Sequence, residues 1–377
     1  RPHVAPAAVP APAVASRESR VPVLPTLPDV HADAVRADAR AAVDRALTWL
    51  ANHQSDDGSW QSAGFVGECG DDVCTGSGVA AYTPGLTGMA LLCFLGDGET
   101  GKGGAYAATV ERGLAYLRRI QDAEGCIGPR TSQHFQYNHM LGALALSEAY
   151  ALSRSPTLRA HARCAVDFVL VSRTPYLGWR YGVRDGDNDT SMTSWAVTVL
   201  ASARQAGLSV DDSAFAGARS WIDKMTEPEF GRVGYNRRGG PTARTQEAMD
   251  RFPAELSEAM TAAGVRARIL AGESPGSSET IQKGLALIAR RPPVWDLEAG
   301  TNDFYYWYLG TAAMRHASAP QWTAWARRLH AALVPNQVAD ADRHGFGSWP
   351  PVDAWSNDGG RVYSTATLCL ALQHLTR

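Results

Sequence analysis

At residues 46–60 the chain reads Ala46-Leu47-Thr48-Trp49-Leu50-Ala51-Asn52-His53-Gln54-Ser55-Asp56-Asp57-Gly58-Ser59-Trp60. A helical pattern ends here in a turn that carries Gly58 and Trp60. Related turns follow at 125–128, 178–179, 231–235, 293–295 and 347–349, roughly 50–65 residues apart. One supersecondary unit is therefore repeated, and each copy must bury its apolar face against its neighbours.

Each turn joins a polar outer helix to a more apolar inner helix. The outer helices are predicted at 35–53, 110–121, 165–172, 217–225, 279–290 and 325–334, and the inner helices are predicted to begin near Thr83, Tyr137, Asp189, Ser257, Asp303 and Val362. No segment alternates as a strand does. The fold class is therefore all-α, and we expect a single (α/α)6 toroid of six hairpins, with an open superhelix as the competing architecture. Closure is favoured because neither terminal copy looks like a polar cap.

Composition and charge limit where the protein can reside and what it can bind. The 377 residues carry a net charge of −2, which leaves no electrostatic footprint for nucleic acid, and no apolar run approaches the ~20 residues that span a bilayer. Residues 1–34 form a Pro/Ala-rich tether and residues 35–377 the toroid domain. Such a tether fits an exported protein in which a cleaved signal or a membrane anchor stood upstream of residue 1, and a cytoplasmic low-complexity tail is the alternative. We expect a local disulfide between Cys69 and Cys74, with two thiols that never meet as the alternative.

Closure would also locate the functional site. All inner helices would start at the same end of the ring, so their free N–H groups and positive dipole ends would converge around a central cavity. Side chains at these helix starts are therefore the first candidates for a site.

These features resemble the alpha-alpha toroid superfamily of squalene–hopene cyclases and protein prenyltransferase β subunits, in particular the prenyltransferase/squalene oxidase repeat proteins. The cyclase signature, Gln-x3-Gly-x-Trp, is intact at Gln54, Gly58 and Trp60. It is degraded after Gln121 and stretched between Gln337 and 347–349. The resemblance implies that the Gln caps helix ends while the Trp stacks over them, so the motif is a structural clamp.

The cyclases initiate their reaction with a protonated Asp in an Asp-x-Asp-Asp-Thr motif. The matching place reads Asp185-Gly186-Asp187-Asn188-Asp189-Thr190, so the resemblance makes Asp189 or Asp187 the candidate acid. The middle Asp of the motif falls on Asn188, which cannot donate a strong acid proton. A capping role for Asp189 at the helix start is the competing interpretation.

Other candidates lie at the starts of the inner helices. His139 is a candidate for positioning a proton or water. Candidate substrate-binding residues are Tyr137, Trp195, Glu258, Asp303, Tyr305, Tyr306, Arg361 and Tyr363. Aromatic faces would stabilise a migrating cation, and helical packing is the alternative role of the same residues.

No cofactor and no metal are expected. The prenyltransferase zinc set needs an Asp, a Cys and a His, whereas the matching segments read Asp303-Phe304-Tyr305-Tyr306 and Arg361-Val362-Tyr363-Ser364. A complement-type thioester is also excluded, because Cys69 has no Gln at the required spacing.

Two functions stay open. The first is a terpenoid-cyclase-like protein with an apolar cavity that acts on an isoprenoid by acid-initiated cyclisation. The second is a non-catalytic exported protein that binds an apolar small molecule or a protein partner at the mouth of the ring.

Overall fold

The computed structural model describes residues 32–70, 72–242, 250, 253, 256–341 and 343–376. Within these ranges the structure is helical, with isolated bridges between loops and no strand. The outer helices are α1 (Ala32–Asn52), α3 (Ala107–Arg119), α5 (Pro156–Ser172), α7 (Asp212–Met225), α10 (Glu279–Ala289) and α12 (Ala319–Leu333). The inner helices are α2 (Thr83–Gly96), α4 (Phe135–Ser153), α6 (Thr190–Gln205), α9 (Ala259–Leu270), α11 (Phe304–Met314) and α13 (Ser356–Thr376). Short 3-10 turns lie at η1 (Phe65–Glu68), η2 (Ala80–Tyr82) and η3 (Val334–Asn336).

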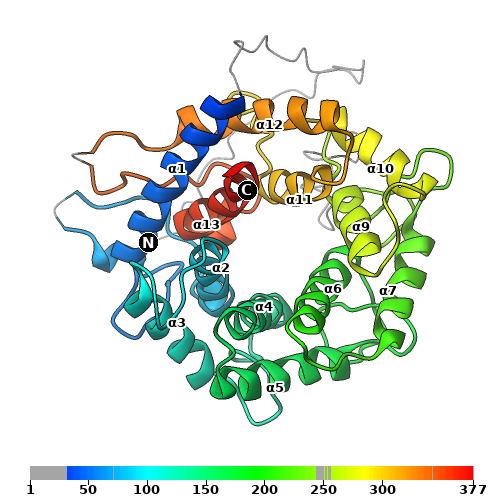
Figure 1. The fold of residues 1–377 in the computed structure, drawn as a ribbon, viewed down its shortest axis with the longest axis horizontal. Coiled ribbons are helices and arrows are strands. Elements are labelled where there is room, and N and C mark those ends of the chain that lie inside the picture. The colour runs from blue at the N-terminus through cyan, green and yellow to red at the C-terminus, as the bar shows by residue number, and fades with distance from the viewer. Residues whose placement is uncertain are drawn as a thin grey trace, which may run out of the picture.

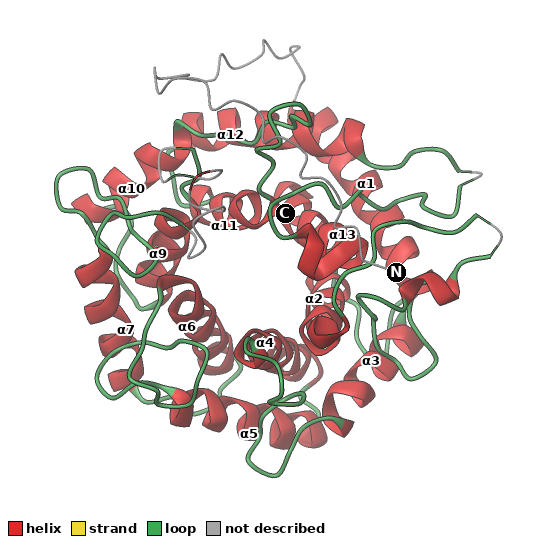
Figure 2. Cartoon of the chain, turned by 180° about the vertical axis from the view of Figure 1, so that it is seen from behind, coloured by secondary structure: helices red, strands yellow, loops and turns green. Residues whose placement is uncertain are grey.

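The helices close into a double ring (Figure 1). Each inner helix packs against the next one along the chain, and α13 packs against α2 to complete the circle. Outside them, α1 contacts both α12 and α13, so the first hairpin meets the last (Figure 2). The expected closed, all-α toroid is confirmed, and an open superhelix is excluded.

Glutamine side chains bridge neighbouring outer helices. Gln54 Nε2 donates to the carbonyl oxygens of Gly58, at 2.9 Å, and of Thr109 in α3, at 3.0 Å. Gln337 Nε2 donates in the same way across the seam to Ala42 in α1, at 2.8 Å. The last outer helix is thereby fastened to the first.

The tryptophans complete these clamps. Trp60 Nε1 donates to the Leu50 carbonyl at 2.7 Å, and Trp349 Nε1 donates to the Leu333 carbonyl at 2.8 Å. Gln121, in the degraded copy, still donates to a carbonyl of α5. The clamp role that the family resemblance implied for the motif agrees with these hydrogen bonds.

Glycine is required inside the clamps. Gly58 has a φ of +89°, and a Cβ there would lie 2.3 Å from the Arg112 carbonyl oxygen. Gly347 has a φ of +88° and would place a Cβ 2.3 Å from the Arg45 carbonyl oxygen. The turn can therefore approach the neighbouring helix only without a side chain.

Several outer helices begin earlier than predicted because of local capping signals. Helix α5 starts at Pro156, directly after Ser155, and α12 follows a capping box between Ser318 and Gln321. Helix α1 starts at Ala32 and so takes up 32–34 of the predicted tether. Residues 1–31 lie outside the described residues, and the tether stays a prediction.

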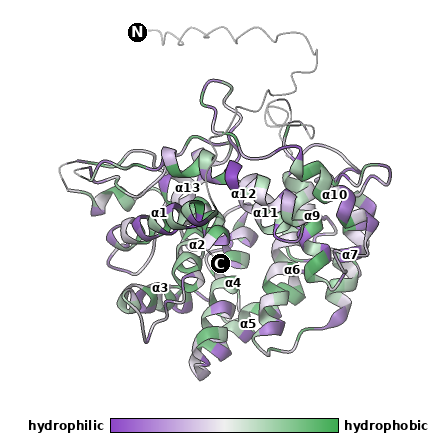
Figure 3. Cartoon of the chain, turned by 45° about the horizontal axis from the view of Figure 1, so that its top comes forward, coloured by the Kyte–Doolittle hydropathy of each residue, from purple (hydrophilic) through white to green (hydrophobic). Residues whose placement is uncertain are grey.

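The inner helices are buried nearly all round, whereas the outer helices present hydrophilic residues to the outside (Figure 3). Small residues permit close approach in the inner ring. A Cβ on Gly88 of α2 would lie 2.7 Å from the backbone of Leu141 in α4. No helix in the described part of the chain is both long and apolar enough to cross a membrane.

Candidate functional site

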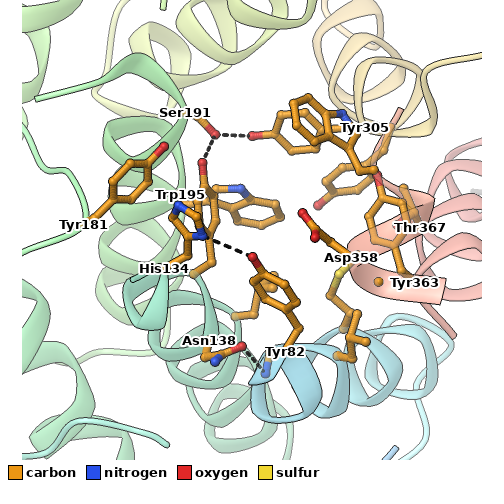
Figure 4. Close-up of a pocket in the computed structure, with 18 of the residues that line it drawn as sticks. Tyr82, His134, Asn138, Tyr181, Ser191, Trp195, Tyr305, Asp358, Tyr363 and Thr367 are labelled. Carbon is orange, nitrogen blue, oxygen red and sulfur yellow. Dashed lines mark hydrogen bonds between the residues drawn. The ribbon is translucent and has the colours of Figure 1, made fainter. Parts of the chain in front are cut away.

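A cavity of about 190 Å³ lies at the end of the ring where the inner helices begin. The first turns of all inner helices contribute to its wall, as expected from closure. We call it the aromatic cup, defined by Tyr82, His134, Tyr137, Tyr181, Trp195, Tyr235, Tyr305, Tyr308, Trp355, Asp358 and Tyr363. In Figure 4 the labelled side chains of this set face a common space. Seven of the chain's 12 tyrosines line it.

A chain of hydroxyl groups spans one wall of the cup. Tyr137 donates to Ser191 Oγ at 3.0 Å, and Ser191 Oγ lies 2.8 Å from the Tyr305 hydroxyl. Trp195 stacks on Tyr305 and on Tyr308, with ring centroids 6.4 and 6.1 Å apart. The predicted residues Tyr137, Trp195 and Tyr305 therefore belong to one hydrogen-bonded and stacked group.

Loop residues supply the rest of the polar lining. The Tyr82 hydroxyl lies 3.1 Å from His134 Nδ1, and both residues directly precede inner helices. Tyr181 and Tyr235 share a hydrogen bond between their hydroxyls. Asp358 precedes the kink at Gly360 in α13 and points into the cup (Figure 4). It is the one carboxylate among the described residues of the wall.

Four phenols of the cup stay protonated. Burial raises the pKa of Tyr137, Tyr235, Tyr305 and Tyr363, and nearby Asp189 or Asp353 raises each further. These hydroxyls are therefore neutral hydrogen-bond donors across the physiological range.

The predicted acid Asp189 lies behind the cup and caps α6. Its Oδ1 accepts from the Met192 N–H at 2.7 Å, its Oδ2 accepts from the Tyr235 hydroxyl at 3.0 Å, and Arg180 Nε lies 3.8 Å away. Asp187 is exposed and paired with Arg180. The capping interpretation of Asp189 matches these contacts, and neither carboxylate lines the cup.

His139 is fully buried away from the cup. Its Nδ1 accepts from the Ile127 N–H at 3.1 Å, and its ring meets Phe168 edge-on. Burial lowers the pKa of His139 to about 3, so the imidazole is neutral. The contacts describe a residue that holds the 125–128 turn on α4.

Three other predicted binding residues face away from the cup. Glu258 pairs with Arg232 at 2.8 Å, and Asp303 caps α11 by accepting from the Tyr306 N–H at 2.9 Å. Tyr306 turns outward and donates to the Arg291 carbonyl at 2.7 Å.

Arg361 and Tyr363 take different positions at the start of α13. Arg361 Nε donates to the Thr75 carbonyl at 2.7 Å, outside the cup. Tyr363 lines the cup and donates to Asp353 Oδ2 at 3.4 Å. Burial raises the pKa of Asp353 to about 7, and neighbouring Asp303 adds to the shift.

Sequence analysis missed Tyr82, His134, Tyr181, Tyr235 and Asp358. A signal existed for two of them. Tyr181 follows Trp179 by two residues, and Tyr235 follows Val233 by two, so both occupy the same place in successive repeats. Tyr82 and His134 stand immediately before the predicted inner helices.

The comparison with known proteins agrees with the fold. A family model described as the squalene-hopene cyclase C-terminal domain matches residues 22–140. No curated protein sequence matches.

Solved structures of several enzyme classes share the architecture. An alpha-1,6-mannanase from Salegentibacter sp. is 11% identical, with a TM-score of 0.59, over 91% of this chain and 98% of its own. Cellobiose 2-epimerase from Bacillus thermoamylovorans is 14% identical, with a TM-score of 0.58, over 90% and 99%. A type II terpene cyclase from Scytonema, solved with geranylgeranyl dihydroxybenzoate, is 12% identical, with a TM-score of 0.55, over 91% and 98%.

The chain therefore folds as an alpha-alpha toroid, and residues 22–140 are similar to the C-terminal domain of squalene-hopene cyclases. The same fold serves terpene cyclases, glycoside hydrolases and sugar epimerases, so the fold alone does not define the chemistry.

Proposed function

We propose that this protein binds one end of an isoprenoid-type apolar ligand in the aromatic cup and stabilises positive charge on it. The observation that carries the proposal is the convergence of aromatic side chains on a single cavity whose wall holds Asp358. Aromatic faces attract cations, and a nearby carboxylate adds to this attraction.

The size of the cup sets the kind of ligand. The volume of the cup is about 190 Å³. Sites that enclose a whole drug-sized molecule are larger, at about 300–1,000 Å³. We therefore infer that the cup takes one end of a prenyl chain, with the remainder leaving through the open mouth.

The lining supports an isoprenoid over a sugar. Most glycosidases need two carboxyl groups that flank the scissile bond. Among the described residues of the wall, Asp358 is the one carboxylate. Leu86, Met89 and Leu141 add apolar surface to the wall.

Acid-initiated cyclisation is the catalytic form of this proposal. Asp358 then replaces Asp189 as the candidate acid, because Asp189 is engaged by Met192 and Tyr235 behind the wall. Incubation with geranylgeraniol or squalene, followed by mass spectrometry, should give a cyclic product that is lost in Asp358→Asn. The exposed Asp56→Asn should leave product formation unchanged.

Non-catalytic binding is the second candidate. It is favoured because the two candidate acids of the cyclase-like segment, Asp187 and Asp189, lie outside the cup. Absence of product from every substrate, together with retained ligand binding, would leave this function standing.

A matched pair of ligands tests the binding step itself. Isothermal titration calorimetry would compare geranyl-trimethylammonium with its uncharged tert-butyl isostere. The cation should bind about 2- to 30-fold more tightly, since a cation–π contact contributes about 0.5–2 kcal/mol. Asp358→Asn should shrink this ratio, whereas equal affinities in the wild type would refute the proposal.

A further inference from the structure

Two cysteines and two histidines meet at the seam of the ring, outside the cup. His53 directly follows α1, Cys69 follows η1, Cys74 lies in the loop before η2, and His344 lies between η3 and α13. One potential ligand atom from each residue lies within 4.8 Å of all the others. We call these four residues the seam cluster.

The spacings within the seam cluster match a tetrahedral metal site. His53 Nε2 lies 3.5 Å from Cys69 Sγ, 3.6 Å from Cys74 Sγ and 3.1 Å from His344 Nδ1. Cys74 Sγ lies 4.0 Å from His344 Nδ1. Zinc bonds of about 2.3 Å to sulfur and about 2.0 Å to nitrogen, at tetrahedral angles, separate the ligand atoms by about 3.3–3.8 Å. A small ion therefore fits between these atoms with only slight adjustment.

Neighbouring groups orient the His53 imidazole and fix the loop that carries His344. His53 Nδ1 contacts the Trp49 carbonyl at 2.7 Å, which makes Nδ1 the protonated nitrogen and leaves the Nε2 lone pair to face the cluster. The Trp49 ring also stacks on His53, with centroids 4.1 Å apart. The backbone N–H of His344 donates to Asp72 Oδ2 at 2.9 Å, which holds this loop against the loop that carries Cys74.

Two members of the cluster are buried and two are partly exposed. His53 is 1% exposed and Cys74 is 7% exposed, while Cys69 and His344 are half-buried. Cys69 and Cys74 are free thiols, so the expected disulfide is not formed. Without a metal, the site would bring two thiols and two imidazoles together in a largely dry space with few partners beyond one another.

We propose that His53, Cys69, Cys74 and His344 bind one Zn²⁺ ion. Thiolate and imidazole ligands select zinc over calcium or magnesium, which prefer oxygen. Four protein ligands leave no open position for a substrate, so the role is structural. This site differs from the expectation of no metal, and it is independent of the function proposed for the cup.

The position of the site indicates that the ion holds the two ends of the ring together. Three ligands come from the first hairpin and the fourth, His344, from the last. The ion therefore links the two ends of the ring beside the contact between α1 and α13. Because the unfolded chain holds no such site, binding would stabilise the closed ring.

Elemental analysis and cobalt substitution test the proposal on the full chain. The protein purified under reducing conditions with added Zn²⁺ should hold about one zinc per chain after gel filtration. Exchange for Co²⁺ should give the intense visible absorption of a tetrahedral site and the near-ultraviolet band of thiolate ligation. Removal of the metal with a chelator should lower the melting temperature, and added Zn²⁺ should restore it.

Matched variants locate the ion. Cys74→Ser and His344→Ala should each reduce bound zinc at least tenfold, whereas Cys164→Ser, at an exposed thiol elsewhere, should retain it. Circular dichroism checks that each variant is folded, and the cobalt spectrum of the wild type does not depend on any variant. Zinc retained by Cys74→Ser would overturn the proposal. The proposal would also be overturned if removal of the metal from the wild type left the melting temperature unchanged. A Cys69–Cys74 disulfide, found by peptide mapping of protein prepared in reductant, would overturn it as well.

Discussion

Gln337 and Ala42 are 295 residues apart in sequence, yet Gln337 Nε2 donates a 2.8 Å hydrogen bond to the Ala42 carbonyl oxygen. The same nitrogen donates to Gly347, and Arg45 Nε donates to Gln337 Oε1 at 2.9 Å. One buried amide therefore joins the last outer helix, its turn and the first outer helix. Closure of the ring rests partly on this side chain.

Gln337→Ala should weaken the closed ring. The substitution leaves buried carbonyl groups without their donor, at a cost of about 1–3 kcal/mol in the free energy of unfolding. Urea denaturation measures the loss, and the exposed Gln282→Ala is the control, because its amide bonds only within its own segment. Equal midpoints for the two variants would contradict a clamp at the seam.

Asp189 is predicted to stabilise helix α6 through its cap. Asp189→Ala should lower stability by about 1–2 kcal/mol, whereas Asp189→Asn should cost less, because Asn is an equally good cap. Thermal denaturation of both variants, with the exposed Asp187→Asn for comparison, measures the difference. If the Asn variant were as unstable as the Ala variant, the charge beside Arg180 would matter more than the cap.

The repeat could be predicted from sequence because its signals are local. A Gln, a Gly and a Trp at fixed spacing make the clamp, and each copy is followed by an apolar helix. Closure followed from the lack of polar caps at either end. The place of the cup then followed from the common direction of the inner helices.

The sequence does not predict which individual side chains point toward the centre of the ring. Tyr305 and Tyr306 are adjacent, and successive helical residues point about 100° apart, so only one of them can face the ring centre. Helix α11 is apolar all round, so its sequence does not indicate which face is turned to the ring centre. Both residues are therefore predicted to line the pocket. The seam cluster was missed for another reason: His344 joins His53 only after the ring has closed.

Buried His139 predicts a rise in stability with pH on the acid side. Its pKa is about 3 in the folded protein, so between about pH 3 and 6.5 the unfolded chain binds a proton that the folded chain does not. The contribution of His139 to the free energy of unfolding should therefore increase through this window. His139→Asn keeps an acceptor for the Ile127 N–H and should flatten the rise. His316→Asn should flatten it less, because burial lowers the pKa of this more exposed imidazole to a smaller extent. An unchanged slope in His139→Asn would rule out this residue as the cause.

Buried Asp353 predicts the opposite slope. Its pKa is about 7 in the folded protein, and in an unfolded chain an Asp titrates near about 3.9. Between these values the folded state retains a proton that the unfolded state has lost, so this contribution is complete below about pH 4. It should disappear as pH rises to about 7, and by linkage it amounts to about 4 kcal/mol at most.

Asp353→Asn should remove this dependence, because an amide does not titrate. It should also keep a side-chain oxygen for Ser356, whose hydroxyl contacts Asp353 Oδ1. Urea denaturation from pH 4 to 8 would compare the wild type, Asp353→Asn and the exposed Asp56→Asn. As pH rises, the free energy of unfolding of Asp353→Asn should increase relative to that of the wild type. The free energy of unfolding of Asp56→Asn should change with pH as the wild type does. A constant difference between the wild type and Asp353→Asn would mean that burial and neighbouring Asp303 do not raise the pKa of Asp353 above its value in the unfolded chain.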